Sequence, residues 1–303
     1  MKSRFLFVVL SFFIFSLAFS QQRYERVRQY PLNNNDTKKF AKKSGVQSLK
    51  VFNYNCKDGK AEEKGFTEVE MSFDKKGNII RWKRFDRSGK MTDDVKYNYD
   101  YKGNLEAAHV VANDTSLLLL SNEYYPKGSI QKQSIYNLDG TVAISFFDAQ
   151  GNITEKGDYN VDGTIIKKLT YKTDPKSGAI LDGSDKNTKA KETYKYNPKT
   201  GLLQSLLLID ENQNKTTINY EYNATGDCIG ETHIDKAKKV IKTVKSKFDN
   251  MGNVTENEVN DIAANKYFKI TAKYDEASLI VEEISYDKTG VQLEIRKVVY
   301  EFY

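Results

Sequence analysis

The sequence has few of the residues that usually carry chemistry or covalent cross-links. Its 303 residues include two cysteines, two histidines, four prolines and one tryptophan. It contains no G-x-S-x-G motif, phosphate-binding loop or G-x-G-x-x-G motif. His109 and His233 have no companion at a metal-ligand spacing, so both are interpreted as ordinary strand residues. We therefore predict no metal, cofactor or catalytic residue, and the pattern favours a protein that is not an enzyme.

Long hydrophobic runs are also missing after residue 20. Before it, Lys2 and Arg4 precede the mostly apolar run Phe5–Phe19, and Ala18-Phe19-Ser20 places small residues at the two positions read by a signal peptidase. The run is shorter than the roughly 20 residues of a spanning helix, so a cleaved signal peptide over 1–20 is favoured over an uncleaved anchor. We expect a periplasmic or secreted protein that does not span the membrane after cleavage.

The charge is weak and mixed in sign. The first 20 residues carry two bases and no acids, which leaves 45 Lys and Arg against 41 Asp and Glu. A nucleic-acid-binding protein would usually concentrate base on one face, so no nucleic-acid partner is expected. Residues 21–44 form a polar leader without alternation, in which Asp36 could cap a short helix over Thr37–Lys43.

What the sequence does contain is one short unit, repeated along most of its length. An aromatic residue is followed by Asp or Asn, two variable residues, Gly, usually a small polar residue or Asn, and an aliphatic residue. Units in this order begin at Phe73, Phe85, Tyr99, Tyr136, Phe147, Tyr159, Tyr222, Phe248 and Tyr286. Adjacent units are most often 12 residues apart, which is typical of a repeat array.

Each unit predicts a β-turn between two strands. In Asp148-Ala149-Gln150-Gly151 the Asp can accept a hydrogen bond from the backbone two residues on, and the Gly can adopt positive φ. This is a type I turn closed by a glycine bulge, a common three-residue hairpin loop. Between the turns, apolar and polar residues tend to alternate, which predicts strands with one apolar and one wet face.

The same unit produces a row of carboxylates, at Asp74, Asp86, Asp100, Asp148, Asp249 and Asp287. Each occupies the turn position that favours Asp for local hydrogen bonding, so a structural role is favoured over a catalytic one. A polysaccharide-acting enzyme would need two carboxyls roughly 5 to 10 Å apart beside a groove, which sequence spacing does not establish.

The repeat domain is predicted to cover residues 45–303. Its largest departure is the segment 173–191, which is polar and rich in turn-forming residues. We interpret it as an exposed loop insertion and the first candidate for a recruited binding loop, although a plain insertion is the more economical explanation.

These units resemble the YD repeats of RHS-type bacterial surface and secreted proteins, which centre on Tyr-Asp-x-x-Gly-(Asn or Arg)-aliphatic. The segments 73–79, 147–153 and 248–254 match that pattern apart from Phe in place of Tyr. The resemblance implies β-hairpins wound into a spiral sheet. The spacing of 12 is tighter than in that family, and no toxin-like region or self-cleavage segment follows. MORN-like repeats are a second, more distant comparison.

Two further sets of residues bear on shape and binding. Cys56 and Cys228 could form a disulfide, but in an open meander they would lie about 65 Å apart, so a bridge would require a rolled or closed sheet. Alternate tyrosines would each share a strand face, and these are either a buried face or a ladder of rings for a ligand. They are Tyr97, Tyr99 and Tyr101; Tyr194 and Tyr196; and Tyr220 and Tyr222.

The predicted fold is all-β, a repetitive antiparallel hairpin array of roughly 20 short strands in a curled or spiral sheet. The predicted function is an exported, non-enzymatic scaffold that binds a protein or a glycan in the bacterial envelope. A polysaccharide-acting enzyme and a structural component of an RHS-type toxin system are the alternatives. The sequence leaves the ligand, its binding residues and the oligomeric state open.

Overall fold

The computed structural model describes residues 35–112, 115–137, 139–174 and 176–303. The predicted signal peptide and leader residues 21–34 lie outside this part of the chain. The described chain begins with a ten-residue helix, α1 (Asn35–Ser44), which contains the short helix expected over Thr37–Lys43. A glycine with φ of 65°, Gly45, then turns the chain into the first strand.

Twenty-one strands follow in the described residues. They are β1 (Val46–Lys57), β2 (Lys60–Ala61), β3 (Phe66–Phe73), β4 (Ile79–Phe85), β5 (Met91–Tyr99), β6 (Leu105–Ala112), β7 (Thr115–Tyr124), β8 (Ile130–Tyr136), β9 (Thr141–Phe147), β10 (Ile153–Asn160), β11 (Ile165–Thr173), β12 (Ile180–Ser184), β13 (Lys191–Tyr196), β14 (Leu203–Ile209), β15 (Lys215–Tyr222), β16 (Cys228–Asp235), β17 (Val240–Phe248), β18 (Val254–Asp261), β19 (Lys266–Tyr274), β20 (Ile280–Tyr286) and β21 (Gln292–Phe302).

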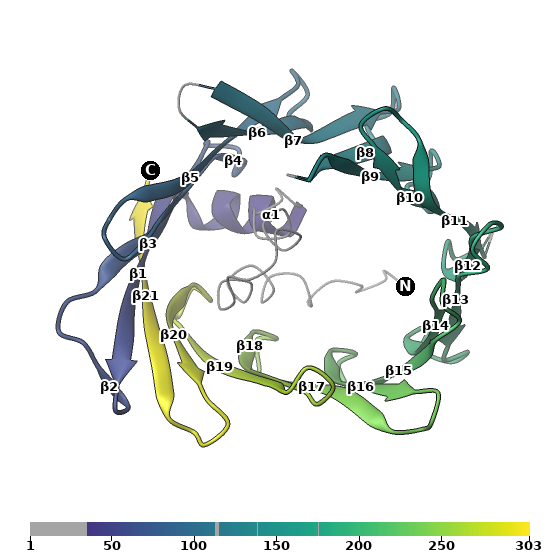
Figure 1. Ribbon diagram of the computed structural model, residues 1–303. Helices are drawn as coiled ribbons and strands as arrows, with labels where there is room; N and C mark the ends of the chain where they lie inside the picture. Colours follow the sequence, from purple (N-terminus) through teal and green to yellow (C-terminus); the bar gives the residue numbers. More distant parts are fainter. Residues whose placement is uncertain (1–34, 113–114, 138, 175) are drawn as a thin grey trace.

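The strands form one antiparallel sheet that closes on itself. From β3 to β21, each strand pairs with the next strand in the sequence. β1 closes the ring by pairing with β3 on one side and β21 on the other. Lys50 of β1 therefore lies opposite both Glu70 of β3 and Val299 of β21. The result is a 20-stranded barrel, with β2 as a short hairpin partner of β1, and Figure 1 shows the ring end-on. The all-β hairpin array is confirmed, and the sheet is closed.

The turns have the predicted geometry. In the loop between β9 and β10, Gly151 N–H donates to the carbonyl of Asp148 at 2.9 Å, and the φ of Gly151 is 87°. The Asp148 carboxylate accepts hydrogen bonds from the backbone N–H groups of Gln150 (3.0 Å) and Asn152 (2.8 Å). One residue type at one position thus closes the turn without help from the rest of the fold, which explains why the hairpins could be read from sequence.

The segment 173–191 is not a loop insertion, and this expectation was wrong. Its middle forms β12, which pairs with β11 on one side and β13 on the other. The polar residues on either side close two turns, in which Gly178 N–H donates to Asp174 and Lys189 N–H donates to Asp185. The strand is short and contains Gly183, so alternation was too weak to reveal it.

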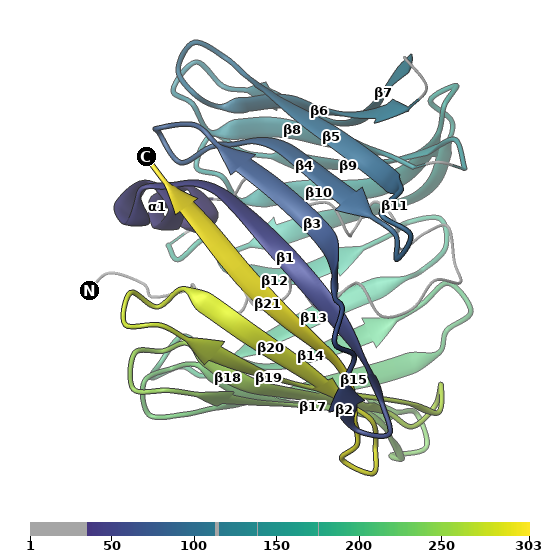
Figure 2. The ribbon, with the colours of Figure 1, turned by 90° about the vertical axis from the view of Figure 1, so that its left-hand side faces the viewer.

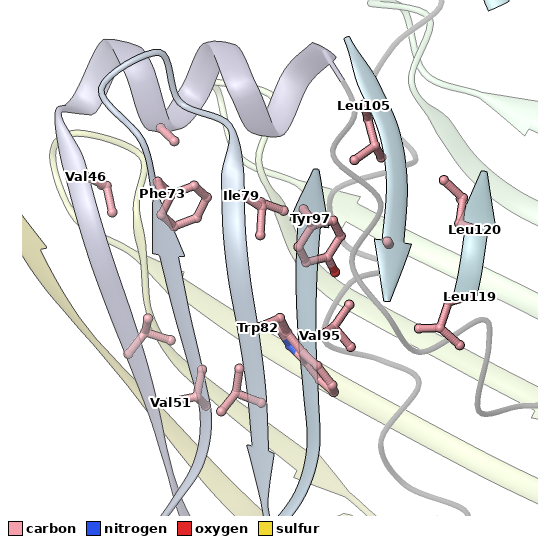
Figure 3. Packing of buried hydrophobic residues seen from close by; sticks show 14 residues of the cluster. Val46, Val51, Phe73, Ile79, Trp82, Val95, Tyr97, Leu105, Leu119 and Leu120 are labelled. Carbon is pink, nitrogen blue, oxygen red and sulfur yellow. The ribbon is translucent and has the colours of Figure 1, made fainter. Parts of the chain in front are cut away.

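The inner face of the barrel can be identified from α1. The helix lies within the ring in Figure 1 and at one end of the barrel in Figure 2. Its Ala41 belongs to the same buried cluster as Phe73, Ile79 and Leu105, and Figure 3 shows Phe73 and Ile79 directly below the helix. The strand face that carries these residues is therefore the inner face. Strand pairing extends the assignment around the ring, because paired residues share a face.

The two faces differ strongly in chemistry. The inner face is apolar and aromatic, and its best-buried members include Trp82, Val95 and Ile270, at 4%, 0% and 1% exposure. The outer face carries most of the charge, arranged as cross-strand ion pairs such as Glu123–Lys132 (2.8 Å) and Lys273–Glu282 (2.7 Å). Partly exposed pairs of this kind contribute little stability each, so the barrel is held mainly by its backbone ladder and its inner face.

The end of the barrel that holds α1, called here the helix rim, depends on one glycine. A Cβ at Gly77 would clash with the Lys38 carbonyl oxygen and lie 2.8 Å from Lys42 N, so the β3–β4 turn packs against the helix backbone. Gly151 occupies the equivalent position of another turn at similar φ, with nothing within 4 Å of its Cβ position. The two glycines are a matched pair that differ in their contact with the helix.

Gly77→Ala is therefore expected to destabilise the protein more than Gly151→Ala. Both substitutions put a side chain at positive φ, which costs about 1 kcal/mol, but only the first also pushes α1 away from the rim. The difference should be about 1 to 3 kcal/mol in the free energy of unfolding, measured by chemical denaturation. Equal losses in the two variants would show that α1 is not seated on the β3–β4 turn.

Candidate functional site

The turn carboxylates are held locally and do not converge. Their Oδ1 atoms accept backbone N–H groups within the same turn, as Asp86 does from Ser88 (2.9 Å) and Lys90 (3.0 Å). The Ser88 hydroxyl lowers the pKa of Asp86, and the Thr289 hydroxyl lowers that of Asp287 in the same way. These residues lie at turns around both ends of the barrel, so the structural role predicted for them is confirmed.

Tyrosines at the helix rim fasten neighbouring strands through hydrogen bonds to backbone carbonyls. The hydroxyl of Tyr99 donates to the carbonyl of Ile79 at 2.6 Å, and Tyr274 donates to Val254 at 2.8 Å. Tyr97 is 5% exposed, and burial raises the pKa of Tyr99 because its phenol is screened from water. Tyr101 does not share their face, since it lies in the β5–β6 turn and is 88% exposed. In this part of the barrel the tyrosines are structural.

The tyrosines on the opposite wall are arranged differently. We define the tyrosine strip as five tyrosines and one glutamate on the inner face of three strands, β11, β13 and β15. They are Tyr171, Glu192, Tyr194, Tyr196, Tyr220 and Tyr222, all half-buried. The strands between them contribute the smaller or aliphatic inner-face residues Gly183 and Leu206, which pair with Tyr171 and Tyr194. The strip is thus a band of rings separated by low, apolar positions.

Glu192 organises the centre of the strip. Its Oε2 accepts hydrogen bonds from the hydroxyls of Tyr171 (3.1 Å) and Tyr194 (2.7 Å). Tyr171 reaches Glu192 from two strands away because Gly183 leaves room, and a Cβ there would lie 2.6 Å from the ring. The other oxygen, Oε1, has no donor among the described residues. Glu192 therefore fixes both rings and keeps one acceptor for a ligand.

The strip tyrosines stay protonated. Burial, reinforced by Glu192, raises the pKa of both Tyr171 and Tyr194 above that of a free phenol. Burial also raises the pKa of Tyr220, to which Glu231 contributes, and that of Tyr222 to about 12. At any physiological pH the rings are therefore neutral phenols, which can donate hydrogen bonds but do not act as bases.

Beside the strip, β16 adds Glu231 and His233 to the inner face. Glu231 pairs with Tyr220 across the ladder, and its carboxylate lies 3.3 Å from His233 Nε2. A shallow hollow of about 810 Å³ over β15, β16, β17 and the turns that follow β15 and β17 includes Glu231 in its lining. Glu192 and Glu231 are three strands apart, about 14 Å along the wall, which exceeds the carboxyl separation used in glycoside hydrolysis.

A second inner-face cluster lies at the seam where the first and last ring strands meet. It consists of Asn53 of β1, Glu68 of β3, Glu283 of β20, and Glu294 and Arg296 of β21. Arg296 is 3% exposed and donates to Glu68 at 2.8 Å and to Glu294 at 2.9 Å. Asn53 also donates to Glu68, at 3.0 Å. One buried guanidinium therefore joins residues that are 228 positions apart in sequence.

Glu283 is the unbalanced member of the seam cluster. It pairs with Arg296 in the ladder and is 4% exposed, yet its Oε2 has no hydrogen-bond partner among the described residues. Burial raises the pKa of Glu283 to about 7, with Arg296 lowering it and Glu68 raising it further. Asn53, Glu68, Glu283 and Arg296 are buried and Glu294 is partly exposed, so the cluster is interpreted as a structural element.

Cys56 and Cys228 are both free thiols. They lie on β1 and β16, which are six strands apart around the shorter arc of the ring, or about 29 Å. A disulfide needs Cα atoms within about 7 Å, so the bridge considered from sequence does not form in this structure. Closure of the sheet is achieved by strand pairing instead.

The remaining candidates from sequence are dispersed. His109 lies on β6 and His233 on β16. In the part of the chain that the structure describes, no three His, Cys, Asp or Glu side chains are grouped to hold a metal ion. The helix it contains is also too short and too polar to cross a membrane.

Comparison with known proteins does not assign the chain to a family. No family model and no curated protein matches it. Among solved structures, the Tc holotoxin pore of Photorhabdus luminescens is similar over 75% of this chain and 14% of that chain, at 13% identity and a TM-score of 0.42. Porin-like proteins of Bacteroides uniformis and Bacteroides vulgatus are similar over 84% of this chain and nearly all of theirs, at 10% and 11% identity and TM-scores of 0.34 and 0.35.

These likenesses are too remote to carry an argument about activity. The chain spans about one seventh of the toxin chain that it matches. The fold itself defines the class, a closed all-β repeat protein with a polar outer face and an aromatic inner face. The resemblance to YD repeats stays a prediction, because no family model matches.

Proposed function

We propose that this chain is an exported, non-enzymatic scaffold of the bacterial envelope that holds a protein or glycan ligand against the inner wall of its barrel. The observation that carries the proposal is the tyrosine strip, a band of half-buried rings around a fixed carboxylate on the inner face. Aromatic surfaces with a few placed polar groups are the usual composition of ligand sites.

The size of the barrel supports an internal site. Twenty strands spaced about 4.8 Å apart and tilted about 40° give a backbone ring roughly 40 Å across. Small eight-stranded barrels are filled by their own side chains, whereas rings of this strand number enclose additional space. A strip on this wall can therefore be reached by a ligand that enters along the barrel axis.

A polysaccharide-acting enzyme is less well supported. In the seam cluster, Glu68 and Glu283 are 5% and 4% exposed and lie beside Arg296. The accessible carboxylates, Glu192 and Glu231, are about 14 Å apart. A role in an RHS-type toxin system rests on the sequence resemblance alone.

The proposal is tested by photo-crosslinking in intact cells of the native host. A photo-reactive phenylalanine analogue at Leu206 would face inward beside the strip, whereas the same analogue at Leu207 would face outward on the same strand. We expect a ligand adduct from position 206 and little or none from position 207. Equal adducts from both positions, or adducts from 207 alone, would contradict a ligand held inside the barrel.

A further inference from the structure

The tyrosine strip carries acid and no paired base. Glu192 makes no ion pair with any described residue. Among the same residues, Glu231 has one such partner, the imidazole of His233. Other half-buried carboxylates do have a lysine partner, as at Glu155–Lys168 (2.6 Å) and Glu256–Lys269 (3.0 Å). Glu192 differs from these two in having no basic partner among the described residues.

We propose that the tyrosine strip binds a cationic segment of a polypeptide, with a lysine or arginine side chain on the tyrosine rings and Glu192 as its counter-charge. This inference rests on the proposed function, since it names the ligand of the same inner wall.

The geometry suits a cation because the rings are oriented in advance. Both hydroxyls next to Glu192 are already used on its Oε2, which leaves Oε1 without a donor among the described residues. A cation over a tyrosine ring is attracted by its negative face, and a charge-assisted hydrogen bond to the carboxylate adds to that attraction. Since the rings are fixed before binding, little side-chain entropy is lost when the ligand arrives.

A neutral ligand fits the strip less well. Covering Glu192 with an uncharged sugar would remove water from a carboxylate that has no basic partner, which is unfavourable. A guanidinium or ammonium group replaces the lost water with an opposite charge. Charge complementarity thus favours a basic polypeptide over a glycan.

The test uses the purified full chain and two synthetic peptides, one alternating glycine with arginine and one in which citrulline replaces each arginine. Calorimetry should show binding of the arginine peptide, weakened at least tenfold by citrulline and at least tenfold by Glu192→Gln. The control variant Glu258→Gln removes an acid from the outer face of β18 and should bind as the parent does. The affinity of the arginine peptide should also fall as salt is raised.

The cationic ligand is contradicted if the arginine peptide does not bind, if citrulline binds equally well, or if Glu192→Gln keeps the parent affinity. Tyr194→Leu removes a ring and its hydrogen bond to Glu192 but keeps the carboxylate, and it provides a second variant with the same expected loss if Glu192→Gln does not fold. A crosslinked adduct at position 206 that proves to be a neutral glycan would overturn this inference while leaving the internal scaffold intact. If no adduct forms at position 206 and the arginine peptide does not bind, both the internal scaffold and the cationic ligand are overturned.

Discussion

Replacing Arg296 with methionine is expected to lower the free energy of unfolding by about 3 to 5 kcal/mol. The guanidinium is 3% exposed and is the only positive charge among Glu68, Glu283 and Glu294 in the seam cluster. Methionine keeps similar length and fills similar space, but it leaves these carboxyls in a buried site without a counter-charge. The loss is measured by chemical denaturation followed by circular dichroism.

The matched control is Lys273→Met on the outer face. Lys273 is in an ion pair with Glu282 at a similarly short distance, but its side chain is 70% exposed. Water can solvate the carboxylate that remains, so the expected loss is below about 1 kcal/mol. If Arg296→Met cost no more than Lys273→Met, the seam cluster would not be holding the two ends of the chain together.

The second large effect is a pH dependence that Glu283→Gln should abolish. The carboxyl of Glu283 has a pKa of about 7 in the folded protein, raised from 4.5 chiefly by burial. Between these two values the folded protein keeps the proton and the unfolded chain has released it. Stability contributed by this group is therefore present at low pH and is lost as pH rises toward 7.

The wild-type protein should accordingly lose about 2 to 3 kcal/mol relative to Glu283→Gln as pH is raised from 5 to 8. Gln cannot ionise, so the variant should become the more stable of the two above neutral pH. Taking the difference between the two proteins cancels the contribution of the turn carboxylates, which titrate in both. Glu282→Gln, on the outer face, leaves Glu283 in place and should therefore keep the wild-type pH dependence. Parallel curves for wild type and Glu283→Gln would rule out a buried, neutral Glu283.

The hairpins were predictable because their information is local. In the β9–β10 loop, Asp148 and Gly151 determine the turn through contacts within five residues. The type of this turn could therefore be predicted from the sequence. The strand number followed from the spacing of these turns. The one expected loop that proved to contain a strand, 173–191, lacks the aromatic residue that marks the other units, because Thr173 stands before Asp174.

Closure was not predictable because it depends on contacts between the two ends of the chain. Val51 opposite Val298 and Glu68 against Arg296 are joined across more than 225 residues, and no repeat pattern specifies them. The only signal in the sequence was an arginine and glutamates at strand positions where the other units have apolar residues. Such departures from a repeat are a useful place to look for closing contacts.

The tyrosine strip was half visible. The pairs Tyr194 and Tyr196, and Tyr220 and Tyr222, were recognised as sharing a strand face. What was missing was Glu192, whose importance comes from Tyr171 reaching across Gly183 on the intervening strand. A glycine on an inner face between two aromatic strands is the signal that could have indicated this contact.

The most direct test of the account is a disulfide trap across the seam. Lys50 and Val299 are paired in the ladder, which puts their Cα atoms about 4.5 to 5.5 Å apart. Both tests use a background in which Cys56 and Cys228 are replaced by serine. Lys50→Cys with Val299→Cys should oxidise to an intramolecular bridge. Lys50→Cys with Lys297→Cys, which is two residues out of register, should not. A bridge in the first pair alone is the predicted result. Free thiols in both, or a bridge in the second pair alone, would contradict a barrel closed by β1 and β21.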